Sequence, residues 1–200
     1  TNPKVLKNGT RAQKLSIYNE KCYIAGYGNN EVNEVEEARI WIDGQAYNKL
    51  SQDNDEKNKN GDYPALANDI ASDGDNWWCV GQERNSGVGY LPKVWINRSN
   101  NNLKREGPAS SLSCIKYENG TFYIGGNDGY HAMYWSATQK SSKENRINNC
   151  QEYDLSSGTT QAKVDDIDVL NGIVVCCGYE RSATGSNIPK LWINGSEYSL

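Results

Sequence analysis

The sequence predicts an all-β fold, a β-propeller-like repeat array built from four-stranded antiparallel blades. Three observations predict it. The composition favours strands and tight turns, because 6 Trp, 13 Tyr and 19 Gly accompany 1 Phe and 1 Met in 200 residues. Two short motifs recur along the chain in a fixed order. The strand-like runs are apolar on both faces, so neighbouring copies must cover each sheet on both sides.

The two motifs repeat about every fifty residues and divide the chain. The first motif is an apolar run that ends in glycine, at Gly26, Gly81, Gly126 and Gly178. The second motif contains tryptophan, at Trp41, Trp95, Trp135 and Trp192. We therefore expect a single domain over residues 1–200, with repeats near 16–50, 66–104, 112–147 and 164–200 and a partial repeat at 1–15.

Each repeat is expected to contain two hairpins, whose turns are readable from the sequence. The first hairpin turns at Asn119-Gly120 and at Asn171-Gly172, which is the preferred dipeptide of a type I′ turn. The second turns at Asp43-Gly44 and Asn194-Gly195. In the third repeat Ser-Ala-Thr follows Trp135 and this turn is lost, which puts the geometry of that blade in doubt.

The N-terminal partial repeat makes the number of hairpins odd. A closed ring that splits one blade between its termini needs an even number. Three arrangements remain open: part of a longer propeller, a four-bladed ring with an extra hairpin, and an open array whose spare hairpin pairs with a neighbouring molecule.

The consensus resembles a known type of repeat. It reads Tyr-x-Ala-Gly-Tyr, a variable loop, then Ala-Lys-x-Trp-x-Asn-Gly and a closing Leu. It is similar to propeller-type repeats in secreted and surface proteins of Bacteroidetes-like bacteria, many without an assigned function. The resemblance covers nearly the whole chain and implies an extracellular β-propeller, but it implies almost no chemistry.

Charge and hydropathy exclude several classes of partner. The net charge is −4, from 21 basic and 25 acidic residues, which argues against a nucleic acid. No window approaches eighteen consecutive apolar residues, so no membrane-spanning helix is expected. The chain begins Thr1-Asn2-Pro3 without a leader, which we interpret as a mature secreted form or a fragment. The expected location is extracellular or at the cell surface.

The cysteines leave two alternatives open. A secreted protein can join six cysteines in up to three disulfides, and the sequence does not choose among the pairings. The other interpretation is that most of them are small buried hydrophobes. Zinc is disfavoured because there is no CxxC motif and a single His, and no cofactor is expected. The cysteines concerned are Cys22, Cys79, Cys114, Cys150, Cys176 and Cys177.

The connections between the two motifs vary most and are the expected binding loops. They cover residues 27–37, 82–91, 127–131 and 179–188 and should gather on one face of a propeller. Acid-plus-Arg pairs beside Tyr would suit a sugar or a polar peptide, and the alternative is a surface ion pair that braces the blade edge. The predicted ligand-binding residues are Tyr27, Gln82, Glu83, Arg84, Asn127, Asp128, Tyr179, Glu180 and Arg181.

Aromatic residues have a structural and a functional interpretation. The four Trp of the second motif are expected to pack between blades rather than to form a lectin-like platform, because they recur at one place in every repeat. Trp77 and Trp78 are adjacent, so one should face away from the other, and an exposed Trp there would be a ligand candidate.

Two further surface features have simple explanations. Four sites match the N-glycosylation acceptor, at Asn8, Asn97, Asn119 and Asn194, although turn chemistry alone explains Asn at these places. Segment 51–62 is acidic but fails the EF-hand spacing, so we interpret it as a solvated insertion rather than a calcium loop.

The leading functional hypothesis is an extracellular, non-enzymatic binding or surface-assembly module with a glycan or protein ligand. Catalysis has little support in the sequence, because His131 is the only His and no catalytic signature surrounds it. One alternative is a structural subunit that forms homo-oligomers or filaments by hairpin or strand exchange. Another is a propeller glycoside hydrolase or lyase, for which a pair of carboxylates would suffice.

Overall fold

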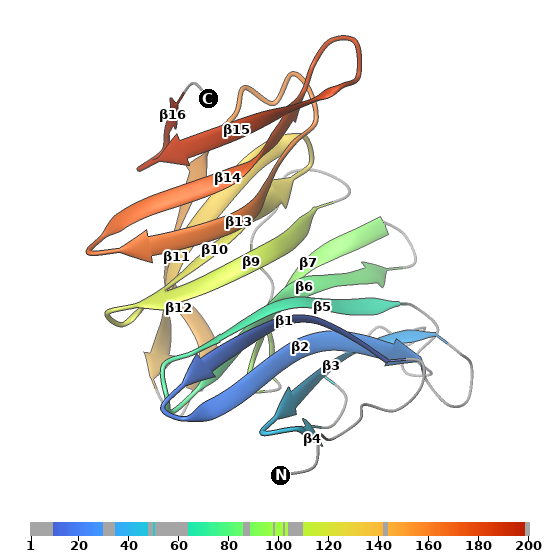
Figure 1. The fold of residues 1–200 in the computed structure, drawn as a ribbon, viewed down its shortest axis with the longest axis vertical. Helices are drawn as coiled ribbons and strands as arrows, with labels where there is room; N and C mark the ends of the chain where they lie inside the picture. The colour runs from blue at the N-terminus through green and yellow to red at the C-terminus, as the bar shows by residue number, and fades with distance from the viewer. Residues whose placement is uncertain are drawn as a thin grey trace.

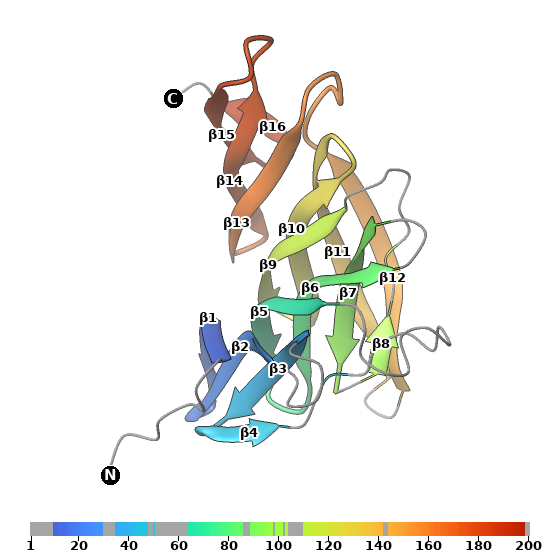
Figure 2. The same cartoon turned by 90° about the vertical axis from the view of Figure 1, so that its right-hand side faces the viewer.

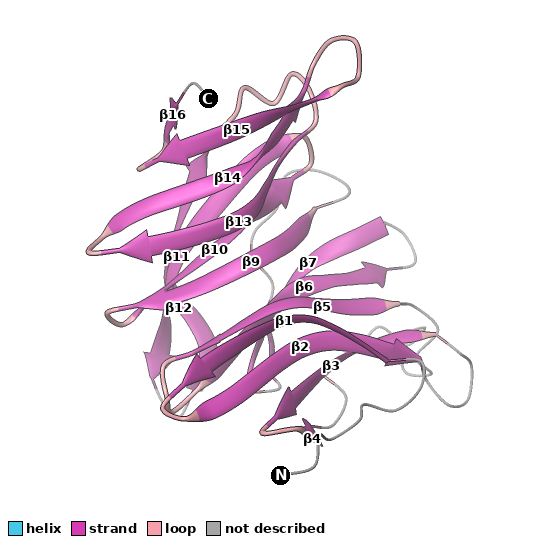
Figure 3. Ribbon diagram, in the orientation of Figure 1, coloured by secondary structure: helices cyan, strands magenta, loops and turns pink. Residues whose placement is uncertain are grey.

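A computed structural model describes residues 10–198, except 30–34, 48–49, 51–63, 86–88, 98, 102, 104–109 and 142–143. These residues form sixteen strands and no helix (Figure 3). The strands are β1 (Thr10–Tyr18), β2 (Lys21–Asn29), β3 (Glu36–Ile42), β4 (Gln45–Tyr47), β5 (Ala65–Ser72), β6 (Trp77–Asn85), β7 (Gly89–Ile96), β8 (Ser99–Asn101), β9 (Ser111–Glu118), β10 (Thr121–Asp128), β11 (His131–Ser141), β12 (Glu144–Asp154), β13 (Ala162–Leu170), β14 (Ile173–Arg181), β15 (Asn187–Ile193) and β16 (Ser196–Tyr198).

The strands form four antiparallel sheets of four strands each, in chain order. We name them sheet 1 (β1–β4), sheet 2 (β5–β8), sheet 3 (β9–β12) and sheet 4 (β13–β16). They follow one another around an axis lined by the first strand of each sheet, and the array is open between sheets 1 and 4 (Figures 1 and 2). The predicted propeller fold is confirmed. Within the described residues, no helix is long and apolar enough to span a membrane.

Each pair of consecutive sheets encloses one apolar core. In all three cores the first strand of the later sheet lies across the face of the earlier sheet. The four Trp of the second motif are all buried, which confirms that they pack in the structure rather than form a platform. Between sheets 2 and 3, Trp78 stacks on Phe122 with 4.2 Å between the ring centres.

Asn-Gly and Asp-Gly turns connect the strands as predicted. Asn119 and Gly120 have φ of 48° and 85°, the left-handed values that a type I′ turn requires. In the second hairpin the turn residue also binds the sheet: Asn194 Oδ1 accepts a hydrogen bond from the Val174 N–H at 2.9 Å. Asp43 and Asn97 make the same bond in sheets 1 and 2, which explains Asn or Asp at this position.

The closing glycine of each repeat faces a β-bulge in the first strand of its sheet. In sheet 2 the register shifts between Ala67 and Asp69, directly opposite Gly81. A Cβ atom at Gly81 would lie 1.9 Å from the Leu66 carbonyl oxygen, so only glycine fits. In the other sheets a backbone carbonyl oxygen lies similarly close to the closing glycine, which is Gly26, Gly126 or Gly178.

The structure differs from the sequence-based expectation at two places in the repeats. The partial repeat 1–15 ends inside β1, which runs over Thr10–Tyr18 and forms part of sheet 1, whereas residues 1–9 lie outside the described residues. In the third repeat the lost turn after Trp135 does not disrupt the blade. Instead β11 and β12 continue as a hairpin of two 11-residue strands, with register shifts that absorb the irregular sequence.

The structure leaves neither Trp77 nor Trp78 exposed, so the ligand candidate considered at this pair is not found. The two side chains do point to opposite faces of sheet 2, as successive residues of a strand must. Both faces are covered, however: Trp77 packs in the core shared with sheet 1, and Trp78 in the core shared with sheet 3. Neither side chain is available to a ligand.

Candidate functional site

The first strands of the four sheets line a cavity of about 340 Å³ at the propeller axis. Its ionisable side chains come from β1, β5, β9 and β13, and they are Lys14, Asp69, Lys116 and Asp166. Asp69 and Asp166 occupy the same position in their repeats, immediately after the bulge. Because a bulge re-aims the residues beside it, both carboxyl groups reach the axis from strands that are otherwise largely apolar.

Asp69 is the most buried acid of this cavity, with 6% of its surface exposed. Its Oδ1 accepts a hydrogen bond from the Ile70 N–H at 2.8 Å, and its Oδ2 accepts one from the Ile115 N–H at 3.0 Å. Burial raises the pKa of Asp69 to about 6, and the nearby Asp166 carboxylate adds to this rise, whereas the backbone bonds and Lys14 oppose it. Asp69 is therefore a carboxyl group that holds its proton up to mildly acidic pH.

Asp166 has a more polar and more open environment. Its Oδ2 lies 3.5 Å from Lys14 Nζ, and both side chains are about half exposed. Its Oδ1 accepts a hydrogen bond from the Ile167 N–H at 3.1 Å. The cavity thus combines a buried carboxyl group with a half-exposed one that is paired with a lysine.

Aromatic side chains complete the lining of the axial cavity. Tyr18 and Tyr117 both belong to it, and their rings meet edge to face with 6.2 Å between the centres. Tyrosine rings next to carboxylates can stack on the apolar face of a sugar ring while the carboxylates bind its hydroxyl groups.

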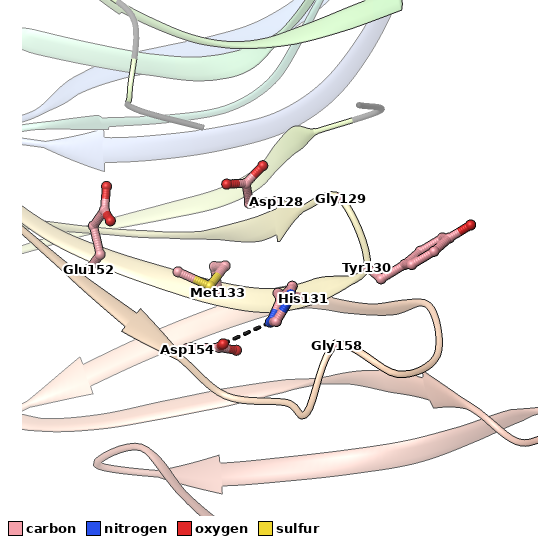
Figure 4. Close-up of a pocket in the computed structure, with 8 residues that line it drawn as sticks. All are labelled: Asp128, Gly129, Tyr130, His131, Met133, Glu152, Asp154 and Gly158. Atoms are coloured by element: carbon pink, nitrogen blue, oxygen red, sulfur yellow. Dashed lines mark hydrogen bonds and ion pairs between the residues drawn. The ribbon is translucent and has the colours of Figure 1, made fainter. Parts of the chain in front are cut away.

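A second hollow, of about 420 Å³, lies at the rim of sheet 3 around the β10–β11 turn. In Figure 4 the His131 and Asp154 side chains face one another, whereas the Tyr130 ring points away from them. His131 Nδ1 is 2.7 Å from Asp154 Oδ2. Gly158 lies against the His131 ring, since a Cβ there would come 2.1 Å from Nε2.

This rim hollow lacks the features of a reaction centre. Asp128, which also lines it, accepts a hydrogen bond from the Ser110 hydroxyl at 2.7 Å. The Asp154 carboxylate is held by His131 and by the Ser156 N–H. Among the described residues no group of His, Cys, Asp and Glu is arranged to hold a metal ion. The axial cavity is therefore the stronger candidate site.

The repeated acid of the predicted binding loops has a lysine partner on the next strand. Glu83 lies 3.6 Å from Lys93, and both are almost fully buried, at 1% and 0% exposure of their side chains. In sheet 4, Glu180 pairs with Lys190 at 3.3 Å. The alternative of a bracing ion pair thus describes these acids, although their partner is Lys and not the adjacent Arg.

The remaining predicted ligand residues do not converge on one site. Tyr27 and Asn127 are buried, and Asn127 bonds the Ser111 hydroxyl and the Gly129 carbonyl. The other positions are more open but belong to different sheets, and their part in ligand binding stays a prediction. These are Gln82 and Arg84 in sheet 2, Asp128 in sheet 3, and Tyr179 and Arg181 in sheet 4.

The structure shows the state of the six cysteines and the location of three of the four glycosylation motifs. None of the six cysteines is bonded to another, so the disulfide alternative finds no support. Burial raises the pKa of the Cys176 thiol to about 12 and the pKa of the Cys79 and Cys114 thiols well above the usual value. Asn97, Asn119 and Asn194 lie in turns, whereas Asn8 and segment 51–62 lie outside the described residues.

Sequence reasoning missed Lys14, Asp69, Lys116 and Asp166. A signal was present, because Asn68-Asp69 and Asp165-Asp166 interrupt apolar strands at the same distance before the closing glycine. A pair of polar residues inside a buried strand indicates a bulge that turns them toward the axis. The motif search concentrated on loops and passed over these strands.

Comparisons with known proteins establish the fold. No family model and no curated protein matches the chain. Among solved structures, an α-L-arabinofuranosidase from Clostridium thermocellum is 9% identical, with a TM-score of 0.50 over 95% of this chain and 70% of its own. A glycosyl hydrolase from Bacteroides ovatus is 10% identical, with a TM-score of 0.48 over 96% and 68%. A protein of the mannoside phosphorylase family that contains β-1,2-mannoside hydrolases is 11% identical, with a TM-score of 0.48 over 96% and 68%.

These matches correct one expectation. The sequence analysis predicts a protein without enzymatic activity, and this prediction is contradicted, because the structure matched with a TM-score of 0.50 is an α-L-arabinofuranosidase. That structure is a five-bladed propeller, whereas the described residues of this chain form four blades. At such low identity the likeness shows the fold alone, a β-propeller, and leaves the reaction to be argued from this chain's own residues.

Proposed function

We propose that the chain is a propeller glycoside hydrolase whose acid is Asp69 and whose second carboxylate is Asp166. The single observation that carries the proposal is the contrast between two carboxyl groups in one axial cavity. Burial raises the pKa of Asp69 to about 6, whereas Asp166 is about half exposed and lies 3.5 Å from Lys14.

The proposed reaction needs both groups. Asp69 donates its proton to the glycosidic oxygen as the bond from that oxygen to the anomeric carbon breaks. The Asp166 carboxylate stabilises the positive charge that develops at the anomeric carbon. Water supplies the hydroxyl group of the new reducing end, and its released proton restores Asp69. Tyr18 and Tyr117 would hold the sugar ring beside the two acids.

Charge in the cavity favours a neutral sugar over an anionic one. Asp69 and Asp166 face Lys14 and Lys116, and Lys116 in turn lies 3.9 Å from Asp168. Each of the two lysines therefore already lies close to an acid of β13. The matching solved structures act on arabinofuranosides and mannosides by their names, so aryl glycosides of neutral sugars are the first substrates to test.

The test is hydrolysis of a panel of 4-nitrophenyl glycosides: α-L-arabinofuranoside, β-xyloside and β-mannoside. The proposal expects turnover of at least one, reduced at least about 100-fold in Asp69→Asn and in Asp166→Asn. Asp168→Asn is the matched control, since this carboxylate lies on the same strand as Asp166 but is 80% exposed. Turnover that survives both cavity variants, or that falls equally in the control, contradicts the assignment.

A further inference from the structure

Three Asn-Gly turns of the described residues share one backbone conformation. They join β9 to β10, β13 to β14 and β15 to β16, at Asn119-Gly120, Asn171-Gly172 and Asn194-Gly195. In these turns the asparagine has a φ of 48°, 52° and 49°, and the glycine has a φ of 85°, 77° and 83°. The backbone conformation therefore does not distinguish the three turns, whereas their contacts do.

An Asn-Gly pair deamidates without an enzyme. The backbone nitrogen of the glycine loses its proton to the solvent and attacks Cγ of the asparagine. A C–N bond forms, and the Cγ–Nδ2 bond breaks to release ammonia. Water then opens the succinimide ring at one of its two carbonyl groups, which leaves aspartate or isoaspartate. The reaction needs a glycine N–H that can lose its proton and an asparagine side chain that is free to turn toward the nitrogen.

The first requirement fails in the turn between β13 and β14. Glu118, at the end of β9, accepts hydrogen bonds from both N–H groups of this turn, at 2.7 Å from Asn171 and at 2.9 Å from Gly172. The β9–β10 and β13–β14 turns lie at the same side of the array (Figure 1). The carboxylate opposes removal of the Gly172 proton, because removal would leave two negative charges in contact.

The second requirement fails in the turn between β15 and β16. Asn194 Oδ1 accepts a hydrogen bond from the Val174 N–H at 2.9 Å, and the Asn194 N–H donates to the Val174 carbonyl at 2.8 Å. Turning this side chain toward Gly195 would break the first of these bonds and leave the N–H of a buried strand residue without its acceptor.

The turn between β9 and β10 meets neither obstacle. Asn119 and Gly120 are exposed, and among the described residues no hydrogen bond holds the Asn119 side chain or the Gly120 N–H. A Cβ atom at Gly120 would meet no atom within 4 Å, so the space over the turn is open. We propose that Asn119 is a site of spontaneous deamidation, and that the contacts of the other two turns protect Asn171 and Asn194.

The product changes the hairpin that carries Glu118. Deamidation of Asn119 adds a carboxylate next to the Glu118 carboxylate, in a chain whose net charge is already −4. Isoaspartate also adds one methylene group to the backbone, and so lengthens a two-residue turn that sets the register of β9 and β10. Both changes act on the contact that joins this turn to sheet 4.

The test is incubation of the folded chain at mildly alkaline pH, followed by peptide mass spectrometry that separates the Asn, Asp and isoaspartate forms. Asn119 should deamidate at least about tenfold faster than Asn171 and Asn194. In urea the three rates should converge, because each asparagine precedes a glycine and the protecting contacts are lost. Each site is followed in its own peptide, since Asn8-Gly9 and Asn60-Gly61 lie outside the described residues.

Glu118→Ala tests the protecting carboxylate directly. This variant should deamidate at Asn171 at least about tenfold faster than the wild-type chain, with an unchanged rate at Asn194. Glu144→Ala is the matched control, because it removes a carboxylate of sheet 3 that pairs with Lys140 instead, and it should leave all three rates unchanged. Far-ultraviolet circular dichroism should show that both variants fold.

Two results overturn the proposal. The first is a folded wild-type chain in which Asn171 or Asn194 deamidates as fast as Asn119, and this comparison does not depend on any variant. The second is an unchanged rate at Asn171 in folded Glu118→Ala, which would mean that the carboxylate protects nothing.

Discussion

At the scale of single residues, burial decides what each acid of the propeller can do. Asp69 and Asp166 occupy equivalent positions, yet only Asp69 is enclosed by the following sheet, whose Ile115 N–H it binds. Asp166 lies on the open side of sheet 4 and meets Lys14 instead. The difference between the two acids therefore comes from the open end of the array and not from their local sequence.

Asp69 should make stability depend on pH in the direction opposite to most acids. Its pKa is about 6 in the folded protein and 3.8 in the unfolded chain, so the unfolded chain releases the proton first. The contribution of Asp69 to the free energy of unfolding is complete below pH 3.8 and is lost as the pH rises through 6. The free energy of unfolding therefore falls by about 3 kcal/mol over this range. Chemical denaturation of wild type and Asp69→Asn at several pH values measures it. The difference between their free energies of unfolding should shift by that amount, and a constant difference would contradict the assignment.

The buried pair Glu83–Lys93 gives a second prediction for single residues. Lys93→Met leaves the Glu83 carboxylate in an apolar site without this partner and should lower the free energy of unfolding by about 3–5 kcal/mol. The double variant Glu83→Gln, Lys93→Met should recover most of the loss. Lys140→Met breaks an exposed pair with Glu144 and serves as the control, with little change expected in the free energy of unfolding. Equal effects of the two single variants in urea titrations would show that burial does not matter here.

At the scale of the strand and hairpin, the closing glycine and the bulge form one repeated unit. In sheet 2 the Leu66 carbonyl oxygen lies over Gly81, and the unpaired residue of the bulge, Asn68, turns the following side chain to the axis. The glycine motif and the position of the axial acids thus have a common cause.

Gly81→Ala tests this unit. The new methyl group would meet the Leu66 carbonyl oxygen at 1.9 Å, and the backbone of β5 would have to move. We expect a loss of about 3 kcal/mol, or about 6–12 °C in Tm. Gly120→Ala is the comparison, because its Cβ meets no atom within 4 Å and only its φ of +85° opposes alanine. That variant should lose about 1–2 kcal/mol. Thermal melts that rank the variants in the reverse order would contradict the account.

The repeats, the turns and the packed Trp column were predictable because each depends on local chemistry that recurs. Asn119-Gly120 requires left-handed backbone wherever it occurs, and a Trp at a fixed place in every repeat indicates a core position. The axial cavity was not predictable in this way. Asp69 and Asp166 are separated by about half of the chain, and their meeting depends on how four sheets turn around one axis.

At the scale of the whole molecule, the propeller is a linear series of sheets in which each contacts its neighbours. Sheets 2 and 3 are covered on both faces by described sheets, whereas one face of sheet 4 is covered by none of the described sheets. In such an array local opening begins at the ends, since fewer contacts hold them. Amide hydrogen exchange should therefore be faster in β14 than in β6, the corresponding strand of sheet 2. Equal protection of the two strands would mean that the four sheets open as one unit.

The account depends most on the assignment of Asp69 as the acid of a glycoside hydrolase. The most direct measurement is the pH dependence of kcat/KM, from about pH 4 to about pH 8, for the aryl glycoside that the wild-type chain hydrolyses best. The account predicts that the rate falls as the pH rises through about 6, the pKa of Asp69. In Asp69→Asn the remaining rate should lose this dependence, while Asp168→Asn should keep the wild-type profile. Absence of turnover on every glycoside tested, or an unchanged fall near pH 6 in Asp69→Asn, would contradict the central claim.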